Sequence, residues 1–567
     1  LKKQGWDNKD IQKIISFDIL DPTAKADWFD PEWMFGVVDG FDVVIGNPPY
    51  VRQENIEDKE KIIESISKCF VDQNGKSLIK INKRSDLYVY FYYKGLDLLK
   101  VNGILCYVSS NSWLDVGYGR ELQEFLLRYM HVLMVVDNLI ERSFDADINT
   151  VIVFIKRPKS VSWDDITKFI AFKIPFGEAN RPDILIKIHK TQEKIITEEF
   201  RVIPKTRKEL WIEGIETEDD EIKEKYLWKY KYAGNKWGGK YLRAPEIFYK
   251  ILEKGKDKLV RLGDIAEVKR GFTTGANEFF YLEPTGKPAP KGLLHVKNSA
   301  GWEGYIEEEF LKPVIKSPKE LKTIIVREED LKYRVFMCHK SKNELKGTYA
   351  LEYIEWGEKQ GYHKRPTCAS RQRWWDLGEW KVSKNILPMF ERERSYCFYN
   401  YCNAYIDATL YWCYSEKWDI TLNVLLNSIL IKLWKELLCR PPEGGGGGPI
   451  QMKVYHYSEM PIPIEFLNIE ITPELLKVHE HFINREILSI FEELGFPKCT
   501  QRNCNHPEHP YEYVKPEEVS FDRIMPDRRE LDKIVFETLG LTEEEQLEVY
   551  RAVLELVKNR LLKAKSR

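Results

Sequence analysis

The chain has 567 residues, more than one hydrophobic core usually supports, so we expect two to four domains of roughly 100 to 200 residues each. Hydrophobic residues make up 43% and charged residues 31% of the sequence, which allows a sizeable interior and excludes wholesale disorder. The formal net charge is only -2, so any affinity for nucleic acid must come from local basic patches.

Cysteine usage and apolar patterning bear on cellular location. The 10 cysteines include no CxxC pair, so neither a dense disulfide framework nor a paired zinc ribbon is indicated, and we expect a reducing cytoplasm. No segment approaches the ~18 uninterrupted apolar residues of a membrane span, so no membrane partner is expected. Residue 1 is Leu, and a charged turn runs straight into an apolar stretch, as we expect of a fragment of a longer chain.

Apolar runs rich in β-branched residues predict the central strands of a sheet, because they do not alternate with polar residues. These runs are 41–45, 104–108, 132–136 and 151–155. Between them, 87–99 and 121–130 carry apolar residues at helical spacing. Strand and helix alternate, so we expect an α/β sheet.

Composition changes along the chain predict four parts, 1–160, 161–230, 231–465 and 466–567. The second part is mixed and highly charged, as in a connector. The third is rich in aromatic and turn residues with one sustained helical segment, 422–438, which predicts a mixed α+β domain. In the fourth, helical spacing of apolar residues predicts a helical tail, with helices at 475–494, 531–536 and 543–562.

The most informative motif is Asn47-Pro48-Pro49-Tyr50, directly after the first predicted strand, where open α/β sheets place their active sites. Two prolines remove two N–H donors, so the Asn47 side-chain oxygen and nearby carbonyls can accept hydrogen bonds from a planar NH2 group. Accepting both N–H protons would favour a tetrahedral nitrogen whose lone pair attacks an electrophilic methyl group, and Tyr50 could stack on the ring. The alternative is an ordinary turn closed by prolines.

Around this motif, the segment from about residue 16 to 156 resembles the catalytic core of the gamma-class DNA adenine-N6 methyltransferases of restriction-modification systems. The later segments resemble the specificity and C-terminal regions of the fused type IIG enzymes. The resemblance implies a partial Rossmann-like methyltransferase sheet, S-adenosyl-L-methionine as cofactor and double-stranded DNA as partner, with the target adenine flipped out of the duplex. Glutamine side-chain methyltransferases share the tetrapeptide but do not need the long aromatic and basic domain 231–465.

The resemblance also implies roles for single residues. Asn47, Pro48, Pro49 and Tyr50 match the catalytic motif, in which Asn47 and the Pro48 carbonyl hold the adenine amine and Tyr50 stacks on the base. Phe144 matches the aromatic residue on the other face of the flipped base, and Asp18 and Phe91 match residues at the cofactor. The alternatives are core packing for Phe144, a solvated turn for Asp18 and helix packing for the segment around Phe91.

One departure from the family bears on activity. The family cradles S-adenosylmethionine on a glycine-rich loop and an acidic residue upstream of the motif, and neither is present upstream of Asn47. Gly117 and Gly119 lie downstream, and we interpret them as the start of a helix. We therefore expect weak or no cofactor binding by this chain and an unpaired apolar parallel edge at 41–45. An upstream cofactor-binding or nuclease segment, or a separate chain, is the further partner that this implies.

The third part carries the signals for DNA recognition. Leu262–Val268 and Arg270–Asn277 resemble the start of target-recognition domains in type I specificity subunits and type IIG enzymes, and Asn235–Pro245 resembles the link into such a domain. The window 363–395 holds eight basic and four acidic residues interleaved with tryptophans, which suits a surface that grips phosphates and reads bases. We predict DNA contacts for Arg371, Arg373, Trp374 and Lys381. A solvated charged face is the alternative.

Two further possibilities stay open. Cys499, Cys504, His506 and His509 are potential zinc ligands at a spacing too tight for a familiar finger, so no metal site is predicted. The chain could also be a sequence-specific DNA-recognition subunit that has no catalysis of its own or is completed by a separate cofactor-binding chain.

Overall fold

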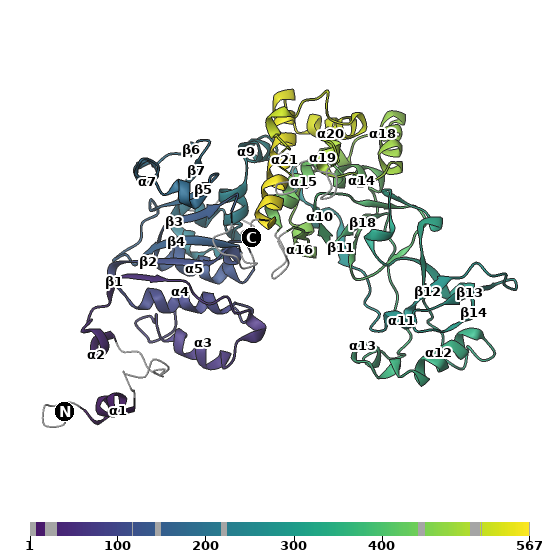
Figure 1. Ribbon diagram of the computed structural model, residues 1–567, viewed down its shortest axis with the longest axis horizontal. Helices are drawn as coiled ribbons and strands as arrows, with labels where there is room; N and C mark the ends of the chain where they lie inside the picture. Colours follow the sequence, from purple (N-terminus) through teal and green to yellow (C-terminus); the bar gives the residue numbers. More distant parts are fainter. Residues whose placement is uncertain are drawn as a thin grey trace.

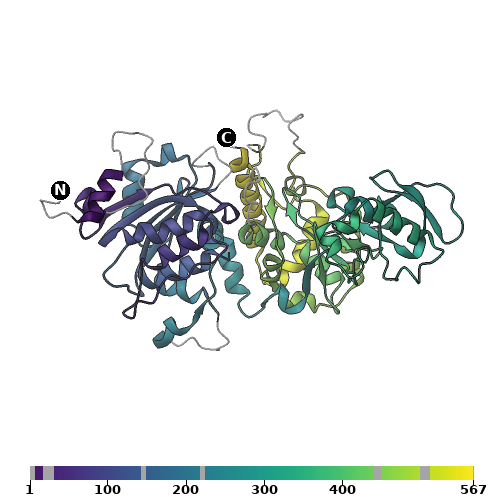
Figure 2. The same cartoon turned by 90° about the horizontal axis from the view of Figure 1, so that it is seen from below.

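A computed structural model describes residues 7–16, 31–115, 117–141, 149–216, 224–439, 448–498, 511 and 513–565. These residues form two lobes that lie side by side, with the C-terminal helix α21 (Glu543–Lys565) between them (Figure 1). The view from below shows the same arrangement (Figure 2). The main hydrophobic core of the first lobe ends at Leu242 and that of the second begins at Ala244, so the two lobes divide at Arg243.

A seven-stranded sheet in the order β1-β2-β4-β3-β5-β7-β6 forms the first lobe. β1 pairs with β2 in parallel, whereas β4 runs antiparallel to both of its neighbours. The strands are β1 (Phe41–Gly46), β2 (Leu99–Ser110), β3 (His131–Asn138), β4 (Thr150–Lys156), β5 (Ile166–Phe172), β6 (Ile195–Ile196) and β7 (Phe200–Thr206). The predicted α/β sheet is confirmed, and all four predicted strands belong to it.

The sheet continues into the segment 161–230, which we expected to be a connector. Strands β5, β6 and β7 come from this segment and form the far side of the sheet. Polar residues interrupt the apolar pattern of these strands, and in the structure their side chains donate hydrogen bonds to backbone carbonyls. Arg201 in β7 is buried and donates to the Ala244 carbonyl, 2.7 Å away, and Lys168 in β5 donates to the Ile188 carbonyl at 3.1 Å. The first lobe therefore runs past residue 160.

Helices cover the two faces of this sheet unequally. On one face, α4 (Leu87–Asp97) and α5 (Gly119–Tyr129) share a core with the central strands, and on the other α7 (Pro182–Lys190) packs near β5 and β7. Among the described strands β1 is an edge strand, and its Val43 and Ile45 side chains are 51% and 76% exposed. The apolar parallel edge expected at 41–45 is thus present. The remaining helices of the lobe are α1 (Asn8–Ser16), α2 (Pro31–Phe35), α3 (Lys59–Ser67), α6 (Phe176–Ala179) and α8 (Arg207–Ile212).

Two larger sheets build the second lobe, which is mixed α+β as predicted. The five-stranded sheet consists of β11 (Glu267–Arg270), β22 (Leu410–Tyr414), β18 (Asn385–Pro388), β20 (Phe398–Asn400) and β16 (Ile325–Val326). The six-stranded sheet consists of β14 (Glu303–Glu307), β13 (Leu293–Lys297), β12 (Tyr281–Pro284), β17 (Tyr333–Phe336), β15 (Leu311–Ile315) and β21 (Tyr405–Ile406). With α12 (Tyr349–Lys359), this second sheet encloses its own core at the end of the molecule far from the first lobe (Figure 1).

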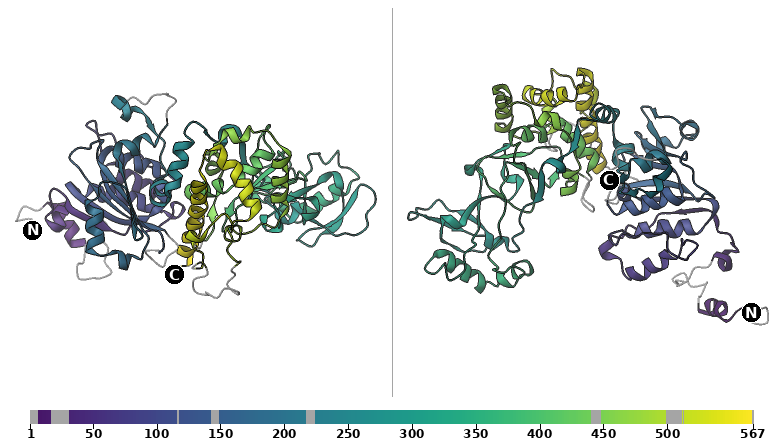
Figure 3. Two further views of the ribbon diagram at one scale, coloured as in Figure 1. Left: turned by 90° about the horizontal axis from the view of Figure 1, so that it is seen from above. Right: turned by 180° about the vertical axis from the view of Figure 1, so that it is seen from behind.

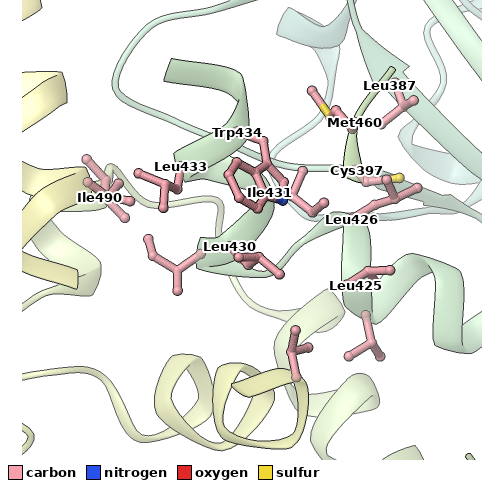
Figure 4. Packing of buried hydrophobic residues seen from close by; sticks show 14 of the residues in the cluster. Leu387, Cys397, Leu425, Leu426, Leu430, Ile431, Leu433, Trp434, Met460 and Ile490 are labelled. Atoms are coloured by element: carbon pink, nitrogen blue, oxygen red, sulfur yellow. The ribbon is translucent and has the colours of Figure 1, made fainter. Parts of the chain in front are cut away.

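The predicted helical tail is confirmed and shares its core with the second lobe, but the single helix predicted at 475–494 is divided into two, with a break at 485–489. Its helices α18 (Pro473–Asn484), α19 (Ile490–Glu493), α20 (Pro526–Thr538) and α21 pack with α9 (Glu246–Lys254), α14 (Ile420–Leu426) and α15 (Ile429–Leu438). Figure 4 shows Leu430, Leu433 and Trp434 of α15 in this core, with Ile490 nearby. Views from above and behind place α21 along the boundary between the lobes (Figure 3).

Buried ion pairs hold the tail to this core. Arg528, which pairs with Glu493 inside the tail, also donates to the Asn427 carbonyl at 2.6 Å, and the Arg560 guanidinium donates to both carboxylate oxygens of Glu436 at 2.8 and 2.9 Å. Removing one partner of such a pair would leave an unpaired buried charge, so these contacts fix the tail in place.

Within the described part of the chain, no helix is long and apolar enough to cross a membrane. The eight cysteines that the structure describes are free thiols.

Candidate active site

The Asn47–Tyr50 loop leaves the carboxyl end of edge strand β1. Because β1 and β2 are parallel, this loop lies beside the carboxyl end of β2, and Tyr50 Oη is 3.3 Å from the Val108 carbonyl oxygen. Tyr50 Oη donates a hydrogen bond of 2.7 Å to Asn47 Oδ1. Asn47 and Pro49 are exposed, whereas Pro48 is buried. Burial raises the pKa of Tyr50 to about 12, so its phenol remains a donor at neutral pH.

In this geometry, the exposed Asn47 side chain offers a hydrogen-bond acceptor to solvent. The carbonyl oxygen of an amide has two lone pairs, so Asn47 Oδ1 can accept a second hydrogen bond while it binds Tyr50. Neither proline contributes an N–H that would compete for an incoming donor. Gly46 permits the close approach to β2, since a Cβ there would lie 2.9 Å from the Tyr107 ring. The loop can therefore accept hydrogen bonds from a planar amine.

Asp86 ties this loop to the rest of the lobe. Its carboxylate accepts the Gln53 N–H and the Tyr118 hydroxyl, both at 2.9 Å. Burial raises the pKa of Asp86 above its usual value, although these hydrogen bonds oppose the rise. The Leu87 N–H also donates to the Val51 carbonyl at 2.9 Å, so the chain after the motif is anchored to the start of α4.

The other residues predicted from the family are only partly placed. Phe91 on α4 is 40% exposed. Asp18 and Phe144, together with Cys499, Cys504, His506 and His509, lie outside the described residues. Helix α5 begins at Gly119, which agrees with the interpretation of Gly117 and Gly119 as a helix start. A Cβ at Gly119 would overlap the Trp113 carbonyl, so this glycine serves packing.

In the second lobe, the side chains predicted to contact DNA have partners within the protein. Arg371 donates to the Thr273 and Thr274 carbonyls at 2.6 and 2.9 Å. Arg373 pairs with Asp376 at 2.6 Å, and Lys381 pairs with Glu267 at 3.0 Å. The Arg373–Asp376 and Lys381–Glu267 pairs are solvent-accessible. Because exposed ion pairs contribute little to the free energy of folding, each basic side chain can exchange its carboxylate partner for a DNA phosphate at little cost.

Trp374 lies in the core of the six-stranded sheet, which the sequence pattern did not predict. It is 7% exposed, its indole N–H donates to Glu358 at 3.1 Å, and its ring centroid lies 4.7 Å from that of Phe279. A ring enclosed in this way has little surface to offer DNA.

Sequence reasoning did not single out Asp115 or Gln123, which hold the segment between the lobes. Gln123 Nε2 donates to the Asn235 carbonyl at 3.0 Å, and the Asp115 carboxylate accepts the Gly239 N–H at the same distance. The local sequence pointed to this contact only through Gly238 and Gly239, two adjacent glycines in the segment that resembles the family's link into the recognition domain.

The first lobe is thus an α/β lobe with an Asn-Pro-Pro-Tyr loop at the end of an edge strand, and it is joined to a second lobe built on two sheets. Residues 2–144 match the family described as Eco57I restriction-modification methylase. Residues 234–492 match the C-terminal domain of the Type II methyltransferase M.Eco57I. The Asn47–Tyr50 motif lies inside the first match, and both matched regions make this chain similar to the methyltransferases of restriction-modification systems.

Individual relatives agree with this family. Type II methyltransferase M.AccI of Acinetobacter calcoaceticus is 23% identical over 458 residues, covering 78% of this chain and 73% of the relative. M.BstVI of Geobacillus stearothermophilus is 36% identical over 97 residues, covering 17% of this chain and 16% of the relative.

Solved structures also resemble the chain. The type IIL restriction-modification enzyme MmeI in complex with DNA has a TM-score of 0.46 and 11% identity, covering 91% of this chain and 57% of its own. The type IIG restriction endonuclease BpuSI has a TM-score of 0.37 and 13% identity, covering 92% and 54%. The chain thus spans just over half the length of these two solved chains.

Proposed function

We propose that this chain holds the target base and recognises DNA in a site-specific DNA methyltransferase of a restriction-modification system. In the complete enzyme, a methyl group passes from S-adenosyl-L-methionine to the N6 amine of an adenine flipped out of double-stranded DNA. The flipped base is required because its amine is otherwise paired inside the duplex. We place this activity in the cytoplasm, with which the free thiols agree.

The observation that carries the proposal is the hydrogen bond from Tyr50 to an exposed Asn47 at the carboxyl end of β1. Asn47 Oδ1 and the Pro48 carbonyl accept the two N–H protons of the amine, and the Tyr50 ring stacks on the base. Holding both protons on acceptors draws the nitrogen lone pair out of conjugation with the ring. Phe144 would cover the second face of the base.

The described residues do not by themselves form a cradle for S-adenosylmethionine. Phe91 offers an exposed ring, but the Asp86 carboxylate is occupied by Gln53 and Tyr118. Gly119 is packed against Trp113. In the proposed complete enzyme, a glycine-rich loop lies beside β1, supplied by a preceding segment or by a separate chain, with Asp18 as a further contact to the cofactor.

The exposed β1 edge favours a second candidate. Val43 and Ile45 would be covered by another strand, so the chain could be a DNA-recognition subunit completed by a separate cofactor-binding chain. The DNA contacts proposed for Arg371, Arg373 and Lys381 are the same in both cases.

The test replaces Asn47 by Ala in the full-length enzyme with its cofactor-binding part. We expect methyl transfer from labelled S-adenosylmethionine to fall on the order of 100-fold or more, because a preorganised acceptor is lost. The Kd for DNA should stay within about twofold. The exposed Asn74→Ala serves as control. Turnover by N47A close to wild type would contradict the proposal, and a methylated base other than N6-methyladenine in digested DNA would contradict the adenine assignment.

A further inference from the structure

The link between the lobes, Asn235–Arg243, is set into the first lobe. Trp237 packs edge to face on Trp113, with ring centroids 5.7 Å apart. Gln123, 1% exposed, donates to the Asn235 carbonyl and accepts the Asn235 N–H, both at 3.0 Å. The same amide donates to the Trp113 and Leu114 carbonyls at 3.2 and 3.1 Å, so it joins the link to the first lobe in one buried network, and a satisfied network of this kind is rigid. The link is therefore part of the first lobe and not a free tether.

Asp115 fixes the far end of the link. It follows β2 by five residues, at the same end of the sheet as the Asn47–Tyr50 loop, and it is 5% exposed. Its carboxylate accepts the Gly239 N–H at 3.0 Å and both terminal nitrogens of Arg243 at 3.3 Å. A Cβ at Gly238 would lie 2.5 Å from the same carboxylate, so the close approach requires glycine there. Gly238–Arg243 forms a π-helix, a conformation that often marks functional positions.

Arg243 continues this contact into the second lobe. Its Nη2 also donates to the Leu437 carbonyl, at 3.2 Å. Leu437 is the penultimate residue of α15, and the last carbonyls of a helix carry the negative end of its dipole, which favours a cation. Helix α15 lies in the core of the second lobe. Arg243 therefore bridges a carboxylate of the first lobe and a helix end of the second, at the residue where the two cores divide.

We infer that Asp115 and Arg243 are positioning residues that hold the second lobe in a fixed orientation to the Asn47–Tyr50 loop. The contacts run from Tyr50 beside Val108, along the end of β2 to Asp115, and through Arg243 to α15. The catalytic consequence rests on the proposed function. DNA held by the second lobe delivers its flipped base to Asn47 only when the two lobes keep this orientation.

A distance measurement tests the positioning without any activity. Spin labels on ketone-bearing unnatural residues replace the exposed Lys76 and Lys291, one in each lobe, so that the native cysteines are not labelled. We expect a narrow distance distribution in the parent chain and a clearly broader one in D115N and R243Q, with R243K between them. D165N is the matched control, because Asp165 forms an equally buried pair with Arg207, at 2.8 Å, inside the first lobe. Unchanged widths in D115N and R243Q, or equal broadening in D165N, would overturn the inference.

The same variants of the complete enzyme test the catalytic consequence. At saturating DNA and cofactor, D115N and R243Q should lower kcat by on the order of 10-fold to 100-fold, because misplacement by about 1 Å has effects of this size. The Kd for DNA should change less than about twofold, and R243K should recover part of the loss. Normal kcat in variants with broadened distances would overturn the catalytic role. If the complete parent enzyme never methylates DNA while D115N and R243Q still broaden the distance distribution, the proposed function fails and the positioning role stands.

Discussion

Tyr50 has two separable parts, a ring proposed to stack on the base and a hydroxyl that holds Asn47 at 2.7 Å. Tyr50→Phe keeps the ring and removes the hydroxyl. We expect kcat of the complete enzyme to fall about 10-fold while DNA affinity is retained, and Tyr50→Ala to lower both. Tyr349→Phe, at an exposed tyrosine of the second lobe, is the control. A Y50F enzyme with wild-type kcat would show that the hydroxyl does not orient Asn47.

We also expect the difference in stability between the parent chain and Y50F to depend on pH. An unfolded tyrosine ionises near pH 10, whereas burial raises the pKa of Tyr50 to about 12. Because the folded-state pKa is the higher one, the stabilisation is complete below about pH 10 and is lost as the pH rises towards 12. The Tm advantage of the parent chain over Y50F should therefore shrink across this range, as thermal unfolding at successive pH values would show. A constant advantage would mean that the phenol is not shielded.

The sequence predicts the role of a residue when the evidence lies in neighbouring residues, but not when it lies in contacts formed only in the folded protein. Asn47 to Tyr50 could be predicted because the chemistry of the motif is contained in four consecutive residues after a strand. Trp374 could not be placed, since an indole among basic residues has the same pattern on a DNA surface as in a core. Asp115 was missed for a similar reason. Its partners Gly239 and Arg243 are more than a hundred residues away in the sequence, and no local pattern identifies such a contact.

At the scale of elements, the strands predicted from β-branched runs were found, and those with buried polar residues were missed. β2 and β4 each contain an unbroken apolar run, 104–108 and 151–155, whereas β7 contains Arg201 and Pro204. Arg201 is compatible with a buried strand only because it reaches the Ala244 carbonyl in the link. A periodicity rule counts such a residue as solvent-facing, which explains why the segment 161–230 was expected to be a connector.

Because β1 is an edge strand with exposed apolar side chains, we expect copies of the chain to associate. Val43 and Ile45 are more than half exposed beside unpaired backbone groups, an arrangement that recruits further strands. We expect the chain to show concentration-dependent light scattering and binding of a hydrophobic dye. Val43→Lys with Ile45→Lys should reduce both, while stability changes within about 0.5 kcal/mol.

A matched control for this prediction lies on α7. Leu185 and Ile186 are 46% and 52% exposed but belong to a helix, which has no free strand edge. Leu185→Lys with Ile186→Lys should leave the scattering unchanged. Equal effects of the two double variants would show that general surface hydrophobicity, and not the β1 edge, drives association.

At the scale of the whole molecule, our proposals place the Asn47–Tyr50 loop and the DNA-contacting residues on two lobes with a fixed relative orientation. The tail helix α21 lies between the lobes, and Lys250 and Lys254 of α9 pair with its Glu548 and Glu545 at 3.0 and 2.6 Å. These two pairs lie within the second lobe. Its boundary with the first lobe is crossed by the Asp115–Arg243 contact and by the pair of Lys194 with Glu246 of α9, at 3.2 Å. A recognition lobe on a free tether would instead present DNA in many orientations, few of them productive.

The proposal that a further segment completes the cofactor site can be tested by calorimetry. We expect the chain alone to bind S-adenosylmethionine with a Kd no tighter than about 1 mM, because Phe91 is the one predicted cofactor contact within the described residues. Adding a candidate fragment with a glycine-rich loop should bring the Kd into the micromolar range, since the fragment supplies the missing contacts and covers β1. In that complex Phe91→Ala should weaken binding, whereas Val71→Ala, at a similarly exposed apolar residue, should not. Micromolar binding by the chain alone would place the cofactor pocket elsewhere and remove the reason for a complementary segment.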